Sequence, residues 1–398
     1  MKPGLRGLSR ALVVFYVLGF VSLFADMVYE GGRSVSGAYL EHLGAPPTGA
    51  AAVGAGEFVG YVLRFLAGYF ATIYQSPRLL WGLVIAGYAL TATSIPLLSC
   101  APAWEAVVSL YVLDRVGKGL RAPSRETIVA EVSRGIGLGK GFGIHELLDQ
   151  VGAFAGPLLV ATLIALQGYK SAFAYLAIPG AISVALVSLA FKLYSPLRGI
   201  SRVAGYGAGF KGLGSKFWLY VSASSALALG FVHWAIVGYY LKSQGLLSDY
   251  EIGAAFSVAM LVDALVAIPM GHVFDKVGLR VLLVQPFLSV ALVSALLFAP
   301  RALTWLIAVC YGVVMCSEES IMKASIACLV EPPKRPLAYG VFGLFFGLAW
   351  AIGGFIYSYA LASWSKPHVL VYATAASATS AYLYAKLSTG ALLASNAK

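Results

Sequence analysis

Apolar segments long enough to cross a lipid bilayer follow one another along almost the entire chain. A transmembrane helix needs about 20 mostly apolar residues, and the sequence offers twelve such segments between short breaks rich in proline, glycine and charge. They cover approximately residues 11–39, 47–73, 79–99, 103–132, 138–165, 170–193, 215–242, 247–274, 278–299, 302–330, 337–361 and 367–387. Only helices and closed barrels satisfy the backbone's hydrogen bonds in lipid, and no segment alternates with a period of two. The sequence therefore predicts an all-α membrane protein with twelve transmembrane helices.

Charged residues are few, and their distribution predicts the topology. Only 11% of the 398 residues are charged, and the mean hydropathy of +0.82 exceeds that of a soluble domain. The net charge of +11 does not indicate a nucleic-acid partner, because lysine and arginine form no soluble basic patch. They are concentrated instead in alternate loops. By the positive-inside rule we expect a multi-pass protein of the plasma membrane with both termini in the cytoplasm.

The two halves of the sequence resemble each other. Residues 142–157 align with residues 339–354, and residues 38–44 align with residues 239–245, each at a constant shift. A duplicated six-helix unit is typical of a transporter with two lobes and a central site. The longest break, residues 195–214, is rich in glycine and basic residues, so we expect a cytoplasmic linker there. It would join an N-terminal lobe of residues 1–194 to a C-terminal lobe of residues 215–398.

The fourth apolar segment carries an unusual number of basic residues. Arg115, Lys118, Arg121 and Arg125 are spaced at three, three and four residues, which places them on one slowly drifting face of a helix. An unpaired charge in the bilayer costs roughly 3 kcal/mol or more. The basic face is therefore expected to look into the protein interior or a polar cavity.

Acidic residues on neighbouring segments are candidate partners for these cations. Asp26 and Glu30 lie on one helical face with Arg33 in the first segment, and Asp149 lies in the fifth. A buried carboxyl group can exchange a proton for another cation as its surroundings change. The alternative is that Asp26 and Glu30 only neutralise Arg33 and the basic face. For Asp149 we expect a salt bridge with Arg115 or Lys118, with a proton relay as the alternative.

The second half contributes a different set of polar and aromatic residues. In the tenth segment Glu319 and Lys323 have the spacing of a self-pairing helix couple, which leaves Glu318 as the freer acid. In the seventh segment His233 and Trp234 are candidates for an amphipathic pocket. Their alternative role is packing, since such residues are frequent in cores and at membrane interfaces.

Three patterns resemble signatures of the major facilitator superfamily. Residues 271–280, Gly-His-Val-Phe-Asp-Lys-Val-Gly-Leu-Arg, resemble the loop signature G-x-x-x-D-[RK]-x-G-x-[RK]. The equivalent place after the second segment, residues 68–78, has lost the acidic residue and its basic neighbour. Residues 115–119 resemble the signature R-x-x-Q-G, with lysine in place of the usual glutamine. Residues 152–157 resemble the signature G-x-x-x-G-P, which is associated with exporters that exchange substrate for protons.

The resemblance covers nearly the whole chain and implies the family's fold and mechanism. We expect two pseudo-symmetric six-helix lobes that form a secondary transporter working by alternating access. The third signature implies the proton-coupled drug and metabolite exporter branch. The expected function is therefore antiport, in which protons are exchanged for small amphipathic organic compounds that leave the cell.

Three groups of site residues are assigned on these grounds. The expected proton-coupling residues are Asp26, Glu30, Arg115 and Asp149. The expected substrate-cavity residues are Arg33, Lys118, Arg121, His233, Trp234, Glu318 and Glu319. The expected gating and conformational residues are Gly152, Gly156, Pro157, Gly271, Asp275, Lys276, Gly278, Arg280 and Arg125.

Two other functions are compatible with parts of the sequence. Four basic residues on one helix can bind a carboxylate or phosphate directly, as in a proton-coupled carrier of organic anions or phosphate esters. A membrane-embedded enzyme using His145 or His233 is a more remote alternative, because the chain has no nucleophile, HExxH or phosphate-loop motif. The four cysteines lack metal-ligand spacing, so neither a metal nor a cofactor is expected. With no large extramembrane domain to dock a soluble partner, we expect a monomer.

Overall fold

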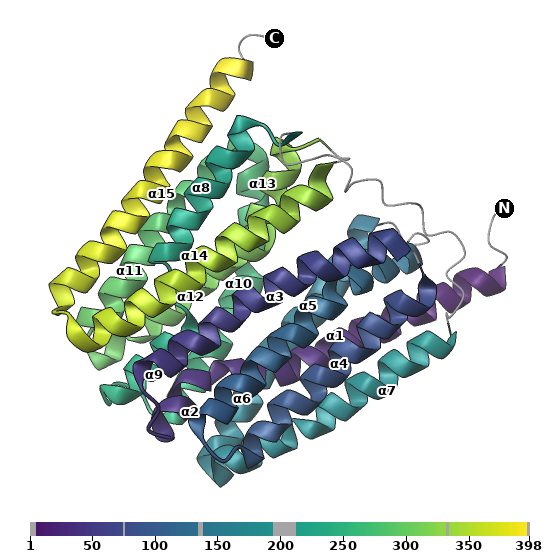
Figure 1. Ribbon diagram of the computed structural model, residues 1–398, viewed down its shortest axis with the longest axis horizontal. Coiled ribbons are helices and arrows are strands. Elements are labelled where there is room, and N and C mark those ends of the chain that lie inside the picture. Colours follow the sequence, from purple (N-terminus) through teal and green to yellow (C-terminus); the bar gives the residue numbers. More distant parts are fainter. Residues whose placement is uncertain (1–4, 75, 134–137, 194–211, 332–333, 396–398) are drawn as a thin grey trace. The chain divides into compact units, whose positions relative to one another are not determined.

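The computed structural model describes residues 5–74, 76–133, 138–193, 212–331 and 334–395 (Figure 1). The regular elements within these ranges are all helical. Residues 195–211 of the predicted linker lie outside the described residues.

The helices pack as two compact units. The first unit comprises Met1–Val35 and Val59–Val203, and the second comprises Ser36–Phe58 and Ala204–Lys398. The predicted division into lobes at residues 1–194 and 215–398 remains a prediction. The structure adds that residues 36–58 pack with the second unit.

The helices of the first unit are α1 (Leu5–Ser34), α4 (Pro77–Leu97), α5 (Trp104–Val132), α6 (Leu138–Tyr175) and α7 (Ala177–Leu193), with the short 3₁₀ helix η1 (Leu98–Cys100). Helix α3 (Pro47–Tyr74) is divided between the units at Val59. The helices of the second unit are α2 (Ser36–His42), α8 (Ser215–Gly230), α9 (Trp234–Ser243), α10 (Asp249–Val277), η4 (Gly278–Leu283), α11 (Val284–Phe298), η5 (Arg301–Leu303), α12 (Trp305–Cys316), η6 (Ser317–Ile321), α13 (Met322–Leu329), α14 (Arg335–Ser363) and α15 (Lys366–Ser395).

Eight helical segments of the described residues are long and apolar enough to cross a membrane. Two of them, Ile144–Leu193 and Asp249–Phe298, are 50 residues long, and each contains a glycine with positive φ, Gly168 or Gly278. Because 50 helical residues would extend about 75 Å and the hydrocarbon core is about 30 Å thick, each of these segments contains two crossings. The charge-rich α5 and the Ala/Ser/Thr-rich α15 complete the twelve crossings expected from the sequence.

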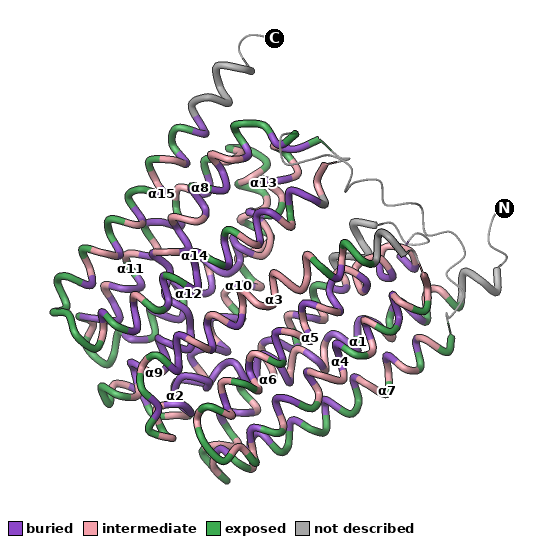
Figure 2. The backbone as a smooth tube through the Cα atoms, in the orientation of Figure 1, coloured by how far each residue is buried: buried purple, intermediate pink, exposed green. Residues whose placement is uncertain are grey.

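The exposed surface of the helices is largely apolar, as lipid contact requires. Leu166, Ile268 and Phe287 are each at least 70% exposed. Figure 2 shows exposed residues recurring along α7 and α15 between buried ones. Exposure of these large apolar side chains to water would be energetically unfavourable, whereas their exposure to the hydrocarbon of a bilayer is favourable.

The first and seventh apolar segments are not the continuous helices that the sequence predicts. The first is interrupted at Val35 between α1 and α2, and the seventh is interrupted over residues 231–233 between α8 and α9. A broken helix in a membrane needs other groups to satisfy the freed backbone atoms. In the second unit, distant side chains supply them.

Four side chains donate hydrogen bonds to the three carbonyls at the end of α8. Tyr372 donates to Leu229 O at 2.8 Å, Tyr357 and Ser289 both donate to Gly230 O at 2.6 and 2.9 Å, and Trp350 donates to Phe231 O at 2.9 Å. On the other side of the break, His233 caps α9 by accepting a hydrogen bond from the backbone N–H of Ala235 at 3.1 Å. The backbone groups on both sides of the break between α8 and α9 are therefore satisfied by specific side chains.

Glycines that the repeat alignment pairs make equivalent contacts. A Cβ atom on Gly156 of α6 would lie 2.3 Å from Met27 O of α1, and one on Gly353 of α14 would lie 2.6 Å from Leu229 O of α8. Neither position can hold a side chain without moving the helices apart, so the backbones are in close contact at both glycines.

The second pair of repeated segments, residues 38–44 and 239–245, also ends in the same backbone conformation. Gly44 after α2 and Gly245 after α9 have φ values of +72° and +62° and donate to the carbonyls of Glu41 and Lys242, both at 2.9 Å. Within the second unit α2 packs directly on α9, where a Cβ on Gly37 would overlap the carbonyl oxygen of Ala235.

Candidate functional site

Three cations of the first unit surround the ring of Tyr29 on α1. The guanidinium carbon of Arg115 lies 3.6 Å from the ring centroid, and the ammonium nitrogen of Lys118 lies 4.0 Å from it. The guanidinium carbon of Arg33 lies 5.9 Å from the same ring. A cation over an aromatic face is attracted by the ring's quadrupole. The basic face of α5 is therefore directed at α1, inside the first unit.

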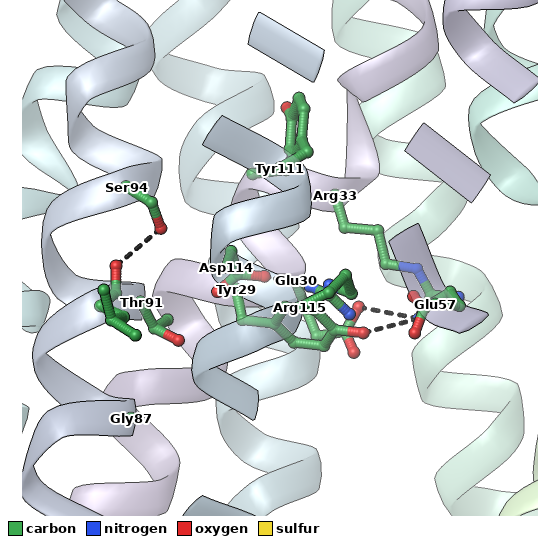
Figure 3. Close-up of polar contacts among 12 residues, drawn as sticks. Tyr29, Glu30, Arg33, Glu57, Gly87, Thr91, Ser94, Tyr111, Asp114 and Arg115 are labelled. Atoms are coloured by element: carbon green, nitrogen blue, oxygen red, sulfur yellow. Dashed lines mark hydrogen bonds and ion pairs between the residues drawn. The ribbon is translucent and has the colours of Figure 1, made fainter. Parts of the chain in front are cut away.

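Carboxylates accompany two of these cations. Glu30 forms an ion pair with Arg33 at 3.5 Å, and Asp114 forms one with Arg115. All four side chains are buried, and Figure 3 shows Tyr29, Glu30, Asp114 and Arg115 close together. A buried charge is tolerated when it is paired and hydrogen-bonded. Asp114 was not among the site residues predicted from the sequence, although its place directly before Arg115 was a usable signal.

Arg121 lies against α4. Its guanidinium donates to Thr91 Oγ1 at 2.6 Å and to Gly87 O at 3.5 Å, and its guanidinium carbon lies 4.6 Å from the centroid of the Tyr88 ring. Its side chain is 2% exposed. At about 100° per residue, Arg121 is rotated by about 120° from Arg115 around α5. The drift of the basic face is thus large enough to place its members against different helices.

A buried polar cluster joins four helices of the first unit, and we call it the Ser22 network. The hydroxyl of Ser22 on α1 lies 3.2 Å from Arg125, 3.3 Å from His145 Nε2 and 3.4 Å from the Tyr88 hydroxyl. Asp149 of α6 completes the network, at 3.5 Å from His145 Nδ1 and 3.7 Å from Arg125.

Asp149 thus pairs with Arg125 and His145, and the expectation that it pairs with Arg115 or Lys118 is wrong. The chain reverses between α5 and α6, so the last arginine of the basic face lies beside the first turns of α6. Arg125, expected to act in gating, belongs to this network. His145 was noted in the sequence only as a candidate for an enzyme.

Asp26 lies one helical turn after Ser22 on the same face of α1. It is partly buried, and its carboxylate forms no hydrogen bond or close ion pair with any described residue. It interacts electrostatically with two acids, Asp149 and Glu30, and with three cations, Lys118, Arg121 and Arg125. Asp26 is therefore a carboxyl group near both negative and positive side chains, and it has no fixed hydrogen-bond or ion-pair partner among the described residues.

The glycines of the G-x-x-x-G-P pattern position this region. A Cβ on Gly152 would lie 2.2 Å from Leu23 O, and Gly156 makes the corresponding contact one turn later. Pro157 lies inside α6. This contact keeps Asp149 level with Ser22 and Asp26.

In the second unit, His233 and Trp234 are buried at the break between α8 and α9. His233 Nε2 lies 3.9 Å from Glu57, and the imidazole centroid lies 5.0 Å from the Trp350 ring. Trp234 is 1% exposed and packs 5.0 Å from both Phe256 and Tyr311, measured between ring centroids. Trp234 is thus part of the aromatic core of this unit, the packing role that the sequence left open.

The acids of the tenth segment lie in a π-helical turn. Glu318 and Glu319 are both in η6, where Glu318 is 9% exposed and Glu319 is partly buried. The expected ion pair between Glu319 and Lys323 does not occur among the described residues, and Lys323 is exposed. A π turn inserts an extra residue into the helix and so shifts the i, i+4 spacing on which that pair depended.

The residues of the loop signature lie at the end of α10. Asp275, Lys276 and Arg280 are exposed and make no ion pair within the described chain. Gly278 has φ of +62° and ends the helix, which explains glycine at this position. A Cβ on Gly271 would meet no atom within 4 Å, so no close helix contact requires glycine at this position.

The sequence profile of the Major Facilitator Superfamily matches residues 15–247 and residues 219–390. The chain belongs to the major facilitator superfamily. This superfamily protein is 35% identical over 346 residues to an uncharacterized protein of Mycobacterium tuberculosis, which covers 85% of this chain and 84% of the relative. It is 26% identical over 346 residues to an uncharacterized MFS-type transporter of Methanocaldococcus jannaschii, with 84% of each chain covered.

Solved transporters share the fold of this superfamily protein. The nucleoside transporter NupG, in a mutant form, aligns with a TM-score of 0.75 at 14% identity and covers 94% of this chain and 99% of its own. A mutant of the peptide transporter POT in complex with alafosfalin aligns with a TM-score of 0.72 at 14% identity over 95% and 94%. At this identity the likeness shows the fold alone. Family and fold together identify a multi-pass membrane transporter of small molecules.

Proposed function

We propose that this protein is a proton-coupled antiporter that works by alternating access and exports small amphipathic organic compounds. It would belong to the drug and metabolite exporter branch of its superfamily. We further propose that it acts as a monomer in the plasma membrane, with both termini in the cytoplasm as the distribution of lysine and arginine predicts.

The observation that carries this proposal is the environment of Asp26. Glu30 and Asp114 are committed to ion pairs with arginines, whereas Asp26 has no fixed partner within the described chain. Asp149 and Glu30 disfavour the ionised form of this carboxyl group, whereas Lys118 and Arg121 favour it. A small displacement of any of these groups changes the balance between the protonated and ionised carboxyl. Coupling of proton binding to a conformational change needs such a group.

The test is transport in liposomes containing the purified full chain. A pH gradient is imposed, and movement of ethidium, a lipophilic cation, is followed by fluorescence. We expect Asp26→Asn to lower gradient-driven movement by about tenfold or more, because the amide cannot exchange a proton. Glu105→Gln removes an exposed carboxylate in the first turn of α5 and should stay within about twofold of the wild type. Wild-type rates in Asp26→Asn would overturn the proposal.

A second candidate, a proton-coupled carrier of organic anions or phosphate esters, is favoured by one observation. Arg33, Arg115 and Lys118 all lie around the ring of Tyr29, which concentrates positive charge in one place. Against it, Glu30 and Asp114 already pair with the two arginines, so an anionic ligand must displace them. Stabilisation of the purified protein by organic anions alone would favour this candidate.

A further inference from the structure

The Ser22 network contains a buried titratable group that the proposed function does not yet use. His145 is 5% exposed and lies seven residues after the start of α6 at Leu138. Both of its ring nitrogens have partners, Asp149 at Nδ1 and Ser22 at Nε2. The geometry points to His145 as the relay through which Asp26 exchanges its proton with the side of the membrane where α1 and α6 begin. This inference rests on the proposed proton coupling at Asp26.

The hydrogen bonds define the direction in which His145 can accept a proton. The Asp149 carboxylate beside Nδ1 favours the tautomer with a proton on Nδ1, so Nε2 of the neutral ring is an acceptor. The oxygen of Ser22 accepts from Arg125, which leaves the hydroxyl proton of Ser22 to point at a hydrogen-bond acceptor such as His145 Nε2. Ser22 also neighbours the Tyr88 hydroxyl and the Asp149 carboxylate, and among these groups we assign the proton to His145 Nε2, because Asp149 is already paired with Arg125.

Helix packing places Asp26 at the other end of this path. Ser22 and Asp26 are four residues apart on α1, a rise of about 6 Å, which one bridging water spans. Gly19 and Gly152 hold α6 against this part of α1, because Cβ atoms there would lie 2.4 Å from Leu148 and 2.2 Å from Leu23. Asp149 also has an oxygen, Oδ1, that is buried and accepts no hydrogen bond from the described residues. It is an acceptor available to water in this space.

Each transfer moves one proton, and every donor in the chain except Asp26 regains the proton that it gives up. Protonated Asp26 loses its proton to Ser22 by way of water, while the hydroxyl proton of Ser22 passes to Nε2 of His145. The resulting imidazolium then releases one proton to water where α1 and α6 begin, which the Lys/Arg distribution predicts to be the cytoplasmic side. The neutral ring is restored and Asp26 is left ionised.

The charges around His145 make this transfer inexpensive. Asp149 of α6 contacts His145 directly, Tyr88 of α4 and Arg125 of α5 reach it through Ser22, and Asp26 of α1 interacts with Asp149 and Arg125, while Glu146 on its own helix is exposed. Before the transfer, Arg125 and Asp149 cancel. After it, the imidazolium and ionised Asp26 cancel as well. The network has zero net charge in both states, so no uncompensated charge is created in the interior.

The experiment separates proton release from substrate movement. Full-length His145→Gln, which retains a polar side chain but cannot titrate, is compared with the wild type in liposomes. Movement of ethidium driven by a pH gradient requires proton release, whereas exchange of labelled for unlabelled ethidium at equal pH does not. We expect the variant to lose gradient-driven movement by about tenfold or more while exchange stays within about twofold.

His368→Gln is the matched control, because His368 is exposed and its ring forms a hydrogen bond with the nearby Ser365 alone among the described residues. Equal loss of both kinds of movement in His145→Gln would mean a structural role and overturn the relay. An unchanged gradient-driven rate would overturn it too. If Asp26→Asn is inactive and His145→Gln is normal, the relay fails alone. If Asp26→Asn is normal, the proposed function itself fails.

Discussion

Arg121 shows how a single buried charge is held without a carboxylate. Its hydrogen bonds go to the Thr91 hydroxyl and the Gly87 carbonyl, and its charge lies over the ring of Tyr88. All three partners are neutral and come from one helix, α4. The contact therefore fixes α5 to α4 while leaving the charge of Arg121 uncancelled, so that it acts on Asp26.

We expect Thr91→Val to lower the free energy of unfolding by roughly 1–3 kcal/mol, because it removes the nearer of the two hydrogen-bond acceptors of a buried guanidinium. Thermal unfolding of the purified protein in detergent measures the change. Thr93→Val is the matched control, since Thr93 is exposed and donates only to its own helix. Equal effects of the two substitutions would contradict this account of Arg121.

At the residue scale, the sequence predicted which side chains are buried but not which partners they have. The spacing from Arg115 to Arg125 correctly placed the basic residues in the protein interior. It did not reveal that Arg121 faces α4 or that Arg125 reaches Asp149, because those contacts depend on how neighbouring helices are rotated and shifted. Asp149 and His145 are four residues apart, but nothing local indicates that Ser22, far away in the chain, joins them.

At the scale of the elements, the break between α8 and α9 is the most unusual feature. The carbonyl of Gly230 accepts two hydrogen bonds, from Tyr357 and from Ser289. Either donor alone satisfies the carbonyl, so the break is protected against the loss of one of them.

We expect Tyr357→Phe and Ser289→Ala each to reduce the free energy of unfolding by about 1 kcal/mol or less. The double variant should lose more than the sum of the two, by roughly 1–2 kcal/mol, because the carbonyl is then buried without a donor. Thermal unfolding of the four proteins forms a double-mutant cycle, and strict additivity would rule out this redundancy. Tyr382→Phe, at a residue that is 67% exposed, controls for loss of a tyrosine hydroxyl.

The sequence revealed the helices but not their interruptions. The twelve apolar segments follow from hydropathy, which is a local property. The break at residues 231–233 depends on hydroxyl and indole groups far along the chain. The sequence revealed neither this break nor the one at Val35 nor the π turn at Ser317–Ile321. No helix-breaking proline marks any of the three places.

At the scale of the whole molecule, the antiport proposal makes a prediction about ligand binding. Protons and a cationic substrate compete for the same acid, so a lipophilic cation should bind more tightly when Asp26 is ionised. A ligand at 100 times its dissociation constant stabilises the native state by about 2.7 kcal/mol. We therefore expect tetraphenylphosphonium to raise the unfolding temperature of the purified protein more at about pH 8 than at about pH 5.5. Asp26→Asn should remove the pH dependence.

Benzoate and glycerol phosphate, tested in parallel, represent the competing substrate class. Stabilisation by these anions alone, with the same magnitude in Asp26→Asn, would reject the cation prediction. It would favour the carrier whose ligand binds the basic residues around Tyr29. The fold and the family followed from the sequence at this scale, because twelve apolar segments and three signatures are properties of the chain itself. The packing of residues 36–58 with the second unit did not, since the repeat alignment says only that residues 38–44 and 239–245 are equivalent.

The contact between α1 and α6 has a mechanical consequence. At Gly152 and Gly156 no side chain separates the two backbones, so there is no flexible layer through which one helix could slide on the other. We expect the pair to behave as a single rigid strut during transport. This rigid pair carries Ser22 and Asp26 on α1 and His145 and Asp149 on α6. The distances among these four side chains should therefore stay constant during the larger motions of the cycle. Under the proposed antiport, Arg125, Lys118 and Arg121, which lie on α5, are the contacts whose displacement would change the charge around Asp26.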